Sequence, residues 1–346
     1  GMRVLRLPQR PVYFPCGNVQ IKQGANRLSE QQGLILSVDG GGTKTEACLA
    51  DTAGHVLGIG RAAGSNALSV GARQAAQAVM AAVTQAAAGA DLRRISLCQL
   101  FIPGFSQCLP LPLPFEVQLL GDSPNAYFGA LGAPNGIVLL AGTGSFAVSY
   151  DGQGNETSIG GWGPVLGDEG SGYDIARRAI QAALCDYDCG RPVTPLGQAV
   201  LAHYGVKSAA SLVHAIYHGG CDRRFMAQLC PTVGEHAGRG EADALRILDD
   251  AAQALCGMAV TLQRRCRLRA CDAALTGGVS GLGDRIKQPL SRYLIQNSIR
   301  LCEPLYSPTV GGVLYTWWTL MGKMPAKTLA ASYHAAYMQK ERELPC

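Results

Sequence analysis

The chain has 346 residues, of which 47% are hydrophobic and 16% are charged, and its formal net charge is +5. This composition is typical of a soluble globular protein, and the longest apolar runs are too short to span a membrane. The positive charges are spread along the chain without interleaved aromatic residues, which argues against nucleic-acid binding. We therefore expect a cytoplasmic protein with no membrane and no nucleic-acid partner.

A chain of this length exceeds the size at which one hydrophobic core usually keeps growing, so we expect two domains with a ligand site in the cleft between them. Its 13 cysteines contain no CxxC pair and have no histidines at zinc-ligand spacing. This irregular spacing favours reduced, buried thiols. Residues 1–33, with little periodicity, are interpreted as an N-terminal extension of unassigned fold and role.

After this extension, residues 34–50 predict a hairpin, in which two strands are joined by a glycine turn at 39–44. The pattern returns in residues 137–150, with a turn at 141–145. Five positions match at one offset: Gly42 with Gly142, Thr43 with Thr143, Asp51 with Asp151, Gly54 with Gly154, and Gly60 with Gly160. Chance recurrence is a fair alternative for either turn alone, but five matches at one offset indicate two similar halves.

Helices alternate with these strands. Five are predicted, at 71–88, 171–184 and 241–268 and after the capped proline starts Thr194-Pro195 and Ser307-Pro308. Residues 273–280 predict a further strand that enters a glycine turn. Both halves are therefore α/β.

The first turn reads Asp39-Gly-Gly-Gly-Thr-Lys-Thr45, which lacks the GxxxxGK[ST] spacing of the common phosphate loop. Its glycines let backbone N–H groups approach a phosphate, and the threonine hydroxyl adds a donor. Three further motifs follow it, namely Ala141-Gly-Thr-Gly-Ser145, GGWGPVLGDEGSG at 160–172 and Leu275-Thr-Gly-Gly-Val-Ser-Gly281. In this order, over about residues 34–320, they resemble the BadF/BadG/BcrA/BcrD ATPase family, and its N-acetylglucosamine kinase branch in particular.

The resemblance implies an α/β fold of duplicated actin-like ATPase (ribonuclease H-like) domains with an interdomain cleft that closes over ATP. The first domain would comprise residues 34–132, joined by a C-terminal helix at 307–346. The second domain would comprise residues 133–306. The resemblance leaves a homodimer open.

The family pattern also implies where ATP and Mg²⁺ bind. The residues it places at the nucleotide are Asp39, Gly41, Gly42, Thr43, Lys44, Gly142, Thr143, Gly144, Gly277 and Gly278. Asp39 would in addition hold Mg²⁺ through water, which suits a hard cation that prefers oxygen ligands. From the residues alone, Asp39 could equally be a turn former and Lys44 a solvent-exposed side chain.

Asp122 follows the apolar run that ends at Leu120, and strand ends in open α/β sheets are where ligands bind. A hydroxyl nucleophile loses its proton during phosphoryl transfer, so a carboxylate is needed near the phosphate. The resemblance assigns this role of catalytic base to Asp122. Without it, Asp122-Ser123-Pro124 is also compatible with a turn or a helix cap.

Asn66 and Asp168 match the sugar-binding positions of the family, and Gly161, Trp162 and Gly163, which precede Asp168 in sequence, are also predicted to contact the sugar. Trp162 offers an apolar face and an indole donor, but a core tryptophan is an equal alternative. Asp168 could also contribute charge to the N-terminus of the helix that follows.

These assignments predict ATP-dependent phosphorylation of a small sugar, N-acetylglucosamine or a related hexosamine, at its primary hydroxyl. Residues 98–121 and Pro124 depart from the family pattern, which leaves the identity of the sugar open. Two other functions compete. One is an ATP-driven activator of an acyl-CoA dehydratase or reductase with a cysteine-bound iron–sulfur cluster, and the other is a sugar sensor without catalysis.

Overall fold

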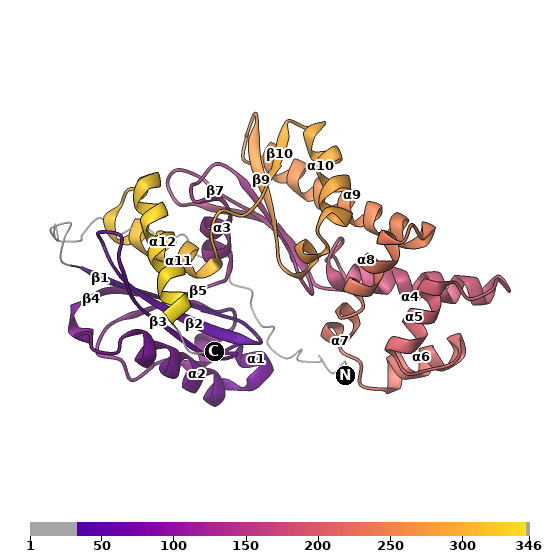
Figure 1. Cartoon of the computed structure of the whole chain (residues 1–346), viewed down its shortest axis with the longest axis horizontal. Helices are drawn as coiled ribbons and strands as arrows, with labels where there is room; N and C mark the ends of the chain where they lie inside the picture. The colour runs from indigo at the N-terminus through magenta and orange to yellow at the C-terminus, as the bar shows by residue number, and fades with distance from the viewer. Residues whose placement is uncertain (1–32, 344–346) are drawn as a thin grey trace, which may run out of the picture.

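A computed structural model describes residues 33–343, which form two five-stranded mixed sheets with helices packed against them (Figure 1). The first sheet contains β1 (Leu34–Gly40), β2 (Lys44–Asp51), β3 (Val56–Ala63), β4 (Ile95–Phe101) and β5 (Val117–Leu120). The second contains β6 (Ile137–Ala141), β7 (Ser145–Tyr150), β8 (Glu156–Gly160), β9 (Cys271–Thr276) and β10 (Ile299–Cys302). Apart from Gly33, the expected N-terminal extension lies outside the described residues.

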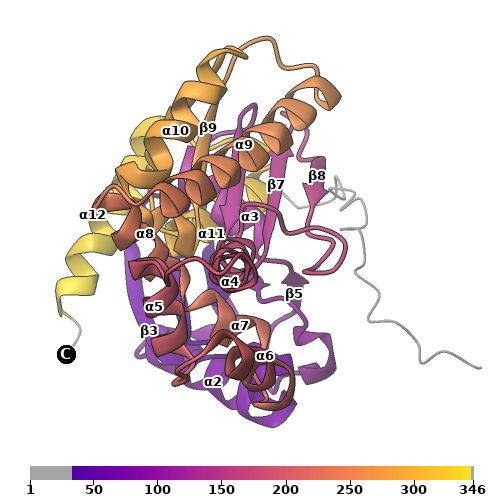
Figure 2. The same ribbon diagram turned by 90° about the vertical axis from the view of Figure 1, so that its right-hand side faces the viewer.

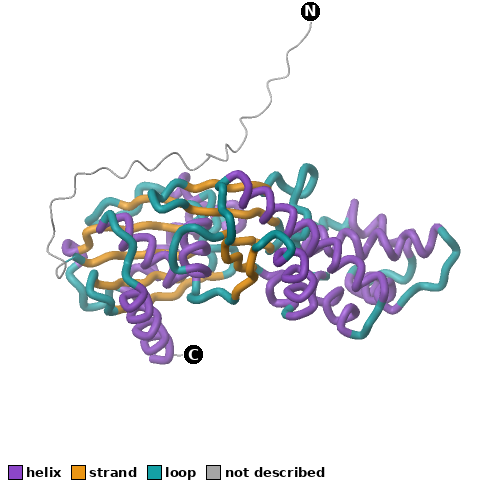
Figure 3. The backbone as a smooth tube through the Cα atoms, turned by 90° about the horizontal axis from the view of Figure 1, so that it is seen from above, coloured by secondary structure: helices purple, strands orange, loops and turns teal. Residues whose placement is uncertain are grey.

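The helices divide between the two sheets. Those before the second sheet are α1 (Ala67–Val70), α2 (Ala72–Ala86) and α3 (Ser123–Leu131). A helical lobe, defined here as residues 172–238, contains α4 (Gly172–Asp188), α5 (Pro195–His203), α6 (Ala209–His218), α7 (Arg223–Ala227) and α8 (Cys230–Gly238). The remaining helices are α9 (Ala242–Arg265), α10 (Asp284–Ile295), α11 (Pro308–Met321) and α12 (Lys327–Glu343). The helical lobe forms one end of the molecule (Figure 3).

The two sheets have the same topology, which confirms the predicted duplication. Their orders are β3-β2-β1-β4-β5 and β8-β7-β6-β9-β10, each an antiparallel three-strand unit extended by two parallel strands. The turn after the second strand also repeats. Asp51 Oδ1 accepts hydrogen bonds from the N–H groups of Ala53 and His55, both at 2.9 Å. One hundred residues later, Asp151 Oδ1 accepts from the equivalent N–H groups at 2.8 and 2.9 Å.

The predicted helices at 71–88, 171–184 and 241–268 correspond to α2, α4 and α9. Thr194 and Ser307 cap α5 and α11 as predicted, because each hydroxyl accepts from the N–H three residues on. Within residues 33–343, every helix is too short or too polar to cross a lipid bilayer.

The C-terminal helix expected over 307–346 is two helices in the described residues. Gly322 ends α11 in the left-handed conformation (φ 68°), and α12 starts only at Lys327. Both helices pack on the first sheet. Tyr337 of α12 donates a 2.5 Å hydrogen bond to the buried Glu46 of β2, which Arg61 of β3 also contacts at 2.7 Å. The domain division at residues 132–133 and 306–307 stays a proposal.

Helices α3 and α11 pack in a core shared by the two sheets (Figures 1 and 2). Their approach is close because Gly311 of α11 faces α3, where an added Cβ would lie 2.0 Å from the Asn125 carbonyl oxygen. Aromatic rings of α3 and α11 fill the adjacent space, with Phe128 and Trp318 at a centroid distance of 5.2 Å. This packing fixes the start of α3, and therefore the position of Asp122.

Candidate functional site

The first glycine turn is hydrogen-bonded to the segment that carries Asn66. The Gly41 carbonyl accepts from the N–H groups of Ser65 at 2.9 Å and of Asn66 at 3.0 Å. Gly64 contacts the turn directly, since a Cβ at this position would lie 2.3 Å from the Gly42 carbonyl oxygen. Any movement of this turn therefore moves the predicted sugar-binding Asn66 with it.

The second glycine turn is bound in the same manner to the segment around Asp168. The Gly142 carbonyl accepts from Gly172 N–H at 2.7 Å, and the Ser145 carbonyl accepts from Gly161 N–H at 2.9 Å. Asp168 is 4% exposed, and its Oδ1 lies 3.4 Å from Ser145 N. Each turn predicted to bind phosphate is thus joined to residues predicted to bind the sugar.

Asp168 faces the second turn and not the N-terminus of α4. That terminus is capped by Ser171, whose Oγ accepts from Asp174 N–H at 3.1 Å. Asp168 also has a positive φ of 66°, which is unfavourable for a non-glycine residue and is often found at functional sites. The alternative in which Asp168 serves only the helix terminus is therefore disfavoured.

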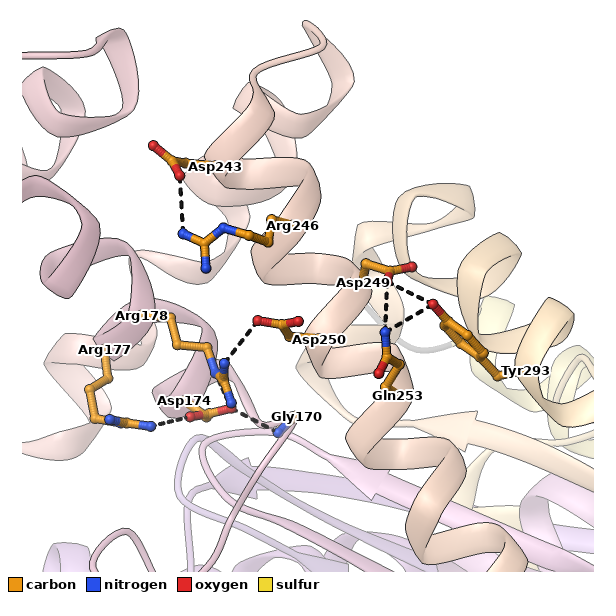
Figure 4. A network of polar contacts seen from close by, with 10 residues as sticks. All are labelled: Gly170, Asp174, Arg177, Arg178, Asp243, Arg246, Asp249, Asp250, Gln253 and Tyr293. Atoms are coloured by element: carbon orange, nitrogen blue, oxygen red, sulfur yellow. Dashed lines mark hydrogen bonds and ion pairs between the residues drawn. The ribbon is translucent and has the colours of Figure 1, made fainter.

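A polar network holds the end of this segment (Figure 4). The buried Asp174 accepts from Gly170 N–H at 3.1 Å and from Arg178 Nε at 3.0 Å. Arg178 also reaches Asp250 of α9 at 3.0 Å. Because the charged groups are paired across two helices, the loop that carries Asp168 has a fixed support.

Asp39 lies at the end of β1, beside the first turn. Burial raises its pKa to about 6, although a hydrogen bond from Asn125 and the charge of Lys44 each lower it. Asn125 of α3 donates from Nδ2 to Asp39 Oδ1 at 2.7 Å, and its own Oδ1 is buried without a partner in the described structure. A bound cation would relieve the cost of ionising Asp39.

Asp122 occupies the N-cap position of α3, but its side chain makes no capping hydrogen bond. The helix-cap alternative therefore does not account for this carboxylate. Asp122 is an exposed residue, but the protein around its carboxylate partly desolvates it and so raises its pKa, with a smaller contribution from the charge of Glu156. Glu156 of β8 accepts from Ser123 Oγ at 2.7 Å, directly beside Asp122.

The residues present fit phosphate groups and one water-bound Mg²⁺. At Gly41, Gly142 and Gly278, a Cβ would meet nothing within 4 Å, so open space adjoins the backbone of both turns and of the β9 end. No group of three or more His, Cys, Asp or Glu side chains in residues 33–343 is arranged to hold a metal ion. A single carboxylate at Asp39 suits a cation that keeps most of its water ligands.

The remaining predicted residues lie at these same places. Gly277 follows β9 with φ 88°, and its added Cβ would lie 2.5 Å from the Ala141 carbonyl oxygen at the second turn. Gly161 and Gly163 also have positive φ values, which favour glycine. Trp162 between them is 74% exposed, so it is not a core tryptophan. Thr43 and Lys44 are exposed at the first turn, and Thr143 and Gly144 are half-buried at the second.

Sequence reasoning missed four residues at this site, namely Asn125, Glu156, Arg223 and Arg224. Arg223 Nη1 lies 3.8 Å from Asp168 Oδ2. A local signal exists only for α7, where Asp222 precedes two arginines as a helix cap. A groove of about 890 Å³ between α9 and α10 is lined by none of the predicted site residues.

Comparison with known proteins identifies the fold and the family of the chain. The repeated sheets define the duplicated actin-like ATPase fold. A solved structure from Chromobacterium violaceum, described as an N-acetylglucosamine kinase, is similar to this chain with a TM-score of 0.67 and 27% sequence identity. The match covers 82% of this chain and 99% of that one. The model of the BadF/BadG/BcrA/BcrD ATPase family matches residues 36–316, so the chain belongs to this family. Family membership implies that the nucleotide is ATP.

Two curated relatives are kinases of amino sugars. The chain is 34% identical over 140 residues to the N-acetylmuramic acid/N-acetylglucosamine kinase of Clostridium acetobutylicum, a match that spans 40% of this chain and only 46% of that protein. It is 30% identical over 245 residues to the N-acetyl-D-glucosamine kinase of Dictyostelium discoideum, which spans 64% of this chain and 76% of that protein.

Proposed function

We propose that the protein is an ATP- and Mg²⁺-dependent kinase that phosphorylates N-acetylglucosamine or a related hexosamine at its primary hydroxyl. The observation that carries this proposal is that each glycine turn is hydrogen-bonded to a predicted sugar-binding segment, the first to Asn66 and the second to the segment of Asp168. The activities of the similar proteins support the same class of substrate.

In this proposal Asp122 accepts the proton of the attacking hydroxyl. A raised pKa makes this carboxylate a stronger base, and the absence of a capping hydrogen bond leaves it available. The N–H groups of the two turns and Lys44 hold the phosphates, while Asn66 and Asp168 orient the sugar. When bound at Asp39, Mg²⁺ supplies positive charge that offsets the phosphate charge.

Sugar binding and phosphate binding are coupled in this arrangement because they share the two turns. Filling the sugar site orders the segments at Asn66 and Asp168 and hence the turns themselves. We therefore expect ATP hydrolysis without sugar to be slow. Equal rates of ADP release with and without the sugar would contradict the proposal.

The iron–sulfur activator is the less suited alternative. Cys185 and Cys189 are exposed near the C-terminal end of α4. At 1.5 Å per residue, Cys185 lies about 20 Å along the helix from its start at Gly172. Its position is therefore remote from the strand-to-helix turn at which such an activator would hold a cluster.

The test is ADP release with Mg²⁺-ATP against a panel of N-acetylglucosamine, glucosamine, N-acetylmuramic acid, glucose and anhydro-sugars. We expect one amino sugar to raise ADP release far above the rate without sugar, and phosphorus NMR of its product to place the phosphate on the primary hydroxyl. A panel in which no sugar raises ADP release would refute the kinase, and sugar binding by calorimetry would then indicate a sensor.

A further inference from the structure

Helix α7 of the helical lobe carries the adjacent Arg223 and Arg224, and its position is well defined. Asp222 caps it by accepting from Phe225 N–H at 2.8 Å. The Phe225 ring packs on His203 of α5, with a centroid distance of 4.7 Å, and the Phe225 carbonyl oxygen lies 3.2 Å from His203 Nε2. These contacts hold α7 within the second half of the molecule.

Arg224 extends from α7 to the first half. Its Nη2 donates a 2.6 Å hydrogen bond to Ser69 Oγ of α1. The same guanidinium lies against the first glycine turn, since a Cβ on Gly42 would be 3.3 Å from Nη1 and 3.4 Å from Nη2. Arg224 therefore reaches the predicted phosphate-binding turn from across the two halves.

The other end of α7 lies beside Gly172, the first residue of α4. A Cβ on Gly172 would be 3.6 Å from the side chain of Ala227, the last residue of α7. Gly172 N–H donates to the Gly142 carbonyl of the second glycine turn at 2.7 Å. Arg224 therefore extends to the first turn from a short helix that packs beside Gly172, the residue hydrogen-bonded to the second turn. The terminal phosphate of a nucleotide held by both turns would lie near this helix.

The guanidinium of Arg224 makes few contacts for the number of hydrogen-bond donors that it carries. In the part of the chain that the structure describes, the bond to Ser69 is its one hydrogen bond, and no carboxylate lies within 4.0 Å of it. An arginine carries five N–H donors, so four remain for another acceptor. Arg223 differs, because its charge faces Asp168 at 3.8 Å.

The charges of the site also call for such a cation. Asp39, Asp122 and Asp168 are acidic, and Lys44 is the cation already predicted at the phosphates. The raised pKa values of Asp39 and Asp122 each include a contribution from a neighbouring carboxylate. A polyphosphate entering this acidic region needs added positive charge to bind.

We propose that Arg224 binds the γ-phosphoryl group of ATP and stabilises the charge that develops on it during transfer. This inference rests on the proposed kinase function. In that reaction the sugar oxygen forms a bond to the γ-phosphorus, the bond to the β,γ-bridging oxygen breaks, the hydroxyl proton passes to Asp122, and ADP leaves. Arg224 exchanges its single bond to Ser69 for a paired, charge-assisted contact with phosphoryl oxygens.

The alternative role for Arg224 is to hold the two halves together through Ser69 alone. The two roles predict different effects on nucleotide binding. A residue that contacts the γ-phosphoryl group changes the affinity for a triphosphate but not for a diphosphate. A residue that only joins the halves changes both affinities, and loss of the Ser69 hydroxyl reproduces its effect.

The experiment compares Arg224→Gln, Arg224→Lys and Ser69→Ala with Arg239→Gln, a control at the exposed arginine that follows α8. Calorimetry without sugar gives the dissociation constants for ADP and for the nonhydrolysable analogue AMP-PNP, each with Mg²⁺. We expect Arg224→Gln to weaken AMP-PNP about tenfold to a hundredfold and ADP less than about twofold. With sugar, we expect kcat to fall about a hundredfold or more, with partial recovery in Arg224→Lys.

Ser69→Ala and Arg239→Gln should match the wild type in all these measurements. The proposal is overturned if Arg224→Gln weakens both nucleotides equally, if Ser69→Ala has the same effect as Arg224→Gln, or if Arg224→Gln changes nothing. If the wild type phosphorylates no sugar but Arg224→Gln still loses AMP-PNP affinity selectively, the sugar-kinase function fails while the γ-phosphoryl contact stands.

Discussion

The two hairpins, β1–β2 and β6–β7, are both antiparallel strand pairs joined by a glycine turn, but they differ in turn length by one residue and in chemistry. In each, the carbonyl of a turn glycine accepts from the N–H of a second segment, and in each half an aspartate organises the turn after the second strand. In the strand pairing of the second hairpin, Leu140 and Gly144 occupy the positions that the charged residues Asp39 and Lys44 occupy in the first.

The difference indicates that both halves kept a glycine turn predicted to bind phosphate, whereas only the first half has charged residues at that turn. Even a matched residue can serve two purposes. Gly60 lets α2 approach, because a Cβ would lie 1.9 Å from the Ala82 carbonyl oxygen, whereas Gly160 adopts φ 80°. Identical residues at one offset therefore indicate that the two halves share a fold. They do not by themselves indicate that the matched residues have the same role.

The largest effect is expected at Asp122, the carboxylate that follows the first sheet. We expect Asp122→Asn to fold normally and to lose roughly 10² to 10⁴ in kcat, the usual contribution of a positioned base. Steady-state ADP release measures this, with Asp243→Asn on the exposed face of α9 as the control. A variant that retains most of its activity would remove Asp122 from the role of base.

The second prediction tests whether the β6–β7 hairpin positions a residue that binds the sugar. A Cβ on Gly144 would lie 2.7 Å from Asp168 Oδ2, so Gly144→Ala must displace that carboxylate. We expect the KM for the sugar to rise about tenfold, the cost of roughly one lost hydrogen bond to a charged group, while the KM for ATP changes little. Gly152→Ala, in open space on the same sheet, is the control. An unchanged KM for the sugar would contradict a role of Asp168 in sugar binding.

The third prediction uses the pKa of Asp39, which burial raises to about 6. Below this pH the free protein binds a proton at Asp39, and a cation that binds the carboxylate must release it. We therefore expect binding of Mg²⁺-ADP to release more than about half a proton at pH 5.5 and almost none at pH 7.5. Calorimetry in buffers of different ionisation enthalpy measures the release, and Asp39→Asn should abolish it. Equal release by that variant would place the proton elsewhere.

Sequence reasoning succeeded where the signal is local. The glycine turns, the strand end at Leu120 and the caps at Thr194 and Ser307 are set by neighbouring residues, and the structure has these elements in place. The break between α11 and α12 also had a local signal, since Gly322 is followed three residues later by a proline.

Arg224 and Asn125 could not be found in this way. Arg224 contacts Ser69 across 155 residues, and Asn125 contacts Asp39 across 86. No periodicity encodes such contacts, because they depend on how the helical lobe and α3 pack against the first sheet. The predicted roles of the site residues come from the family resemblance, and the structure adds their neighbours.

The smallest expected effect concerns the turn that follows the second strand in each half, at Asp51 and Asp151. Burial would raise the pKa values of Asp51 and Asp151, but hydrogen bonds from backbone N–H groups and neighbouring side chains lower both below the ordinary value. An acid whose pKa is lowered by folding stabilises the protein above its unfolded pKa, and this contribution is lost as the pH falls through the folded pKa. We expect Asp51→Ala and Asp151→Ala each to cost about 1 kcal/mol of unfolding free energy at pH 7, and less below about pH 4.

Urea denaturation of the two variants measures these costs, and Asp51→Asn and Asp151→Asn, which keep the Oδ1 acceptor, should lose less than about half as much. Equal costs in the two halves mean that the repeated turn has one physical role and that the halves differ in their charges alone. A cost confined to Asp51 would mean that its turn depends on the C-terminal helix α12, whose Tyr333 hydroxyl donates to the Asp51 carbonyl at 2.5 Å. In that case the duplication preserved a sequence pattern in the second half after its contribution to stability had been lost.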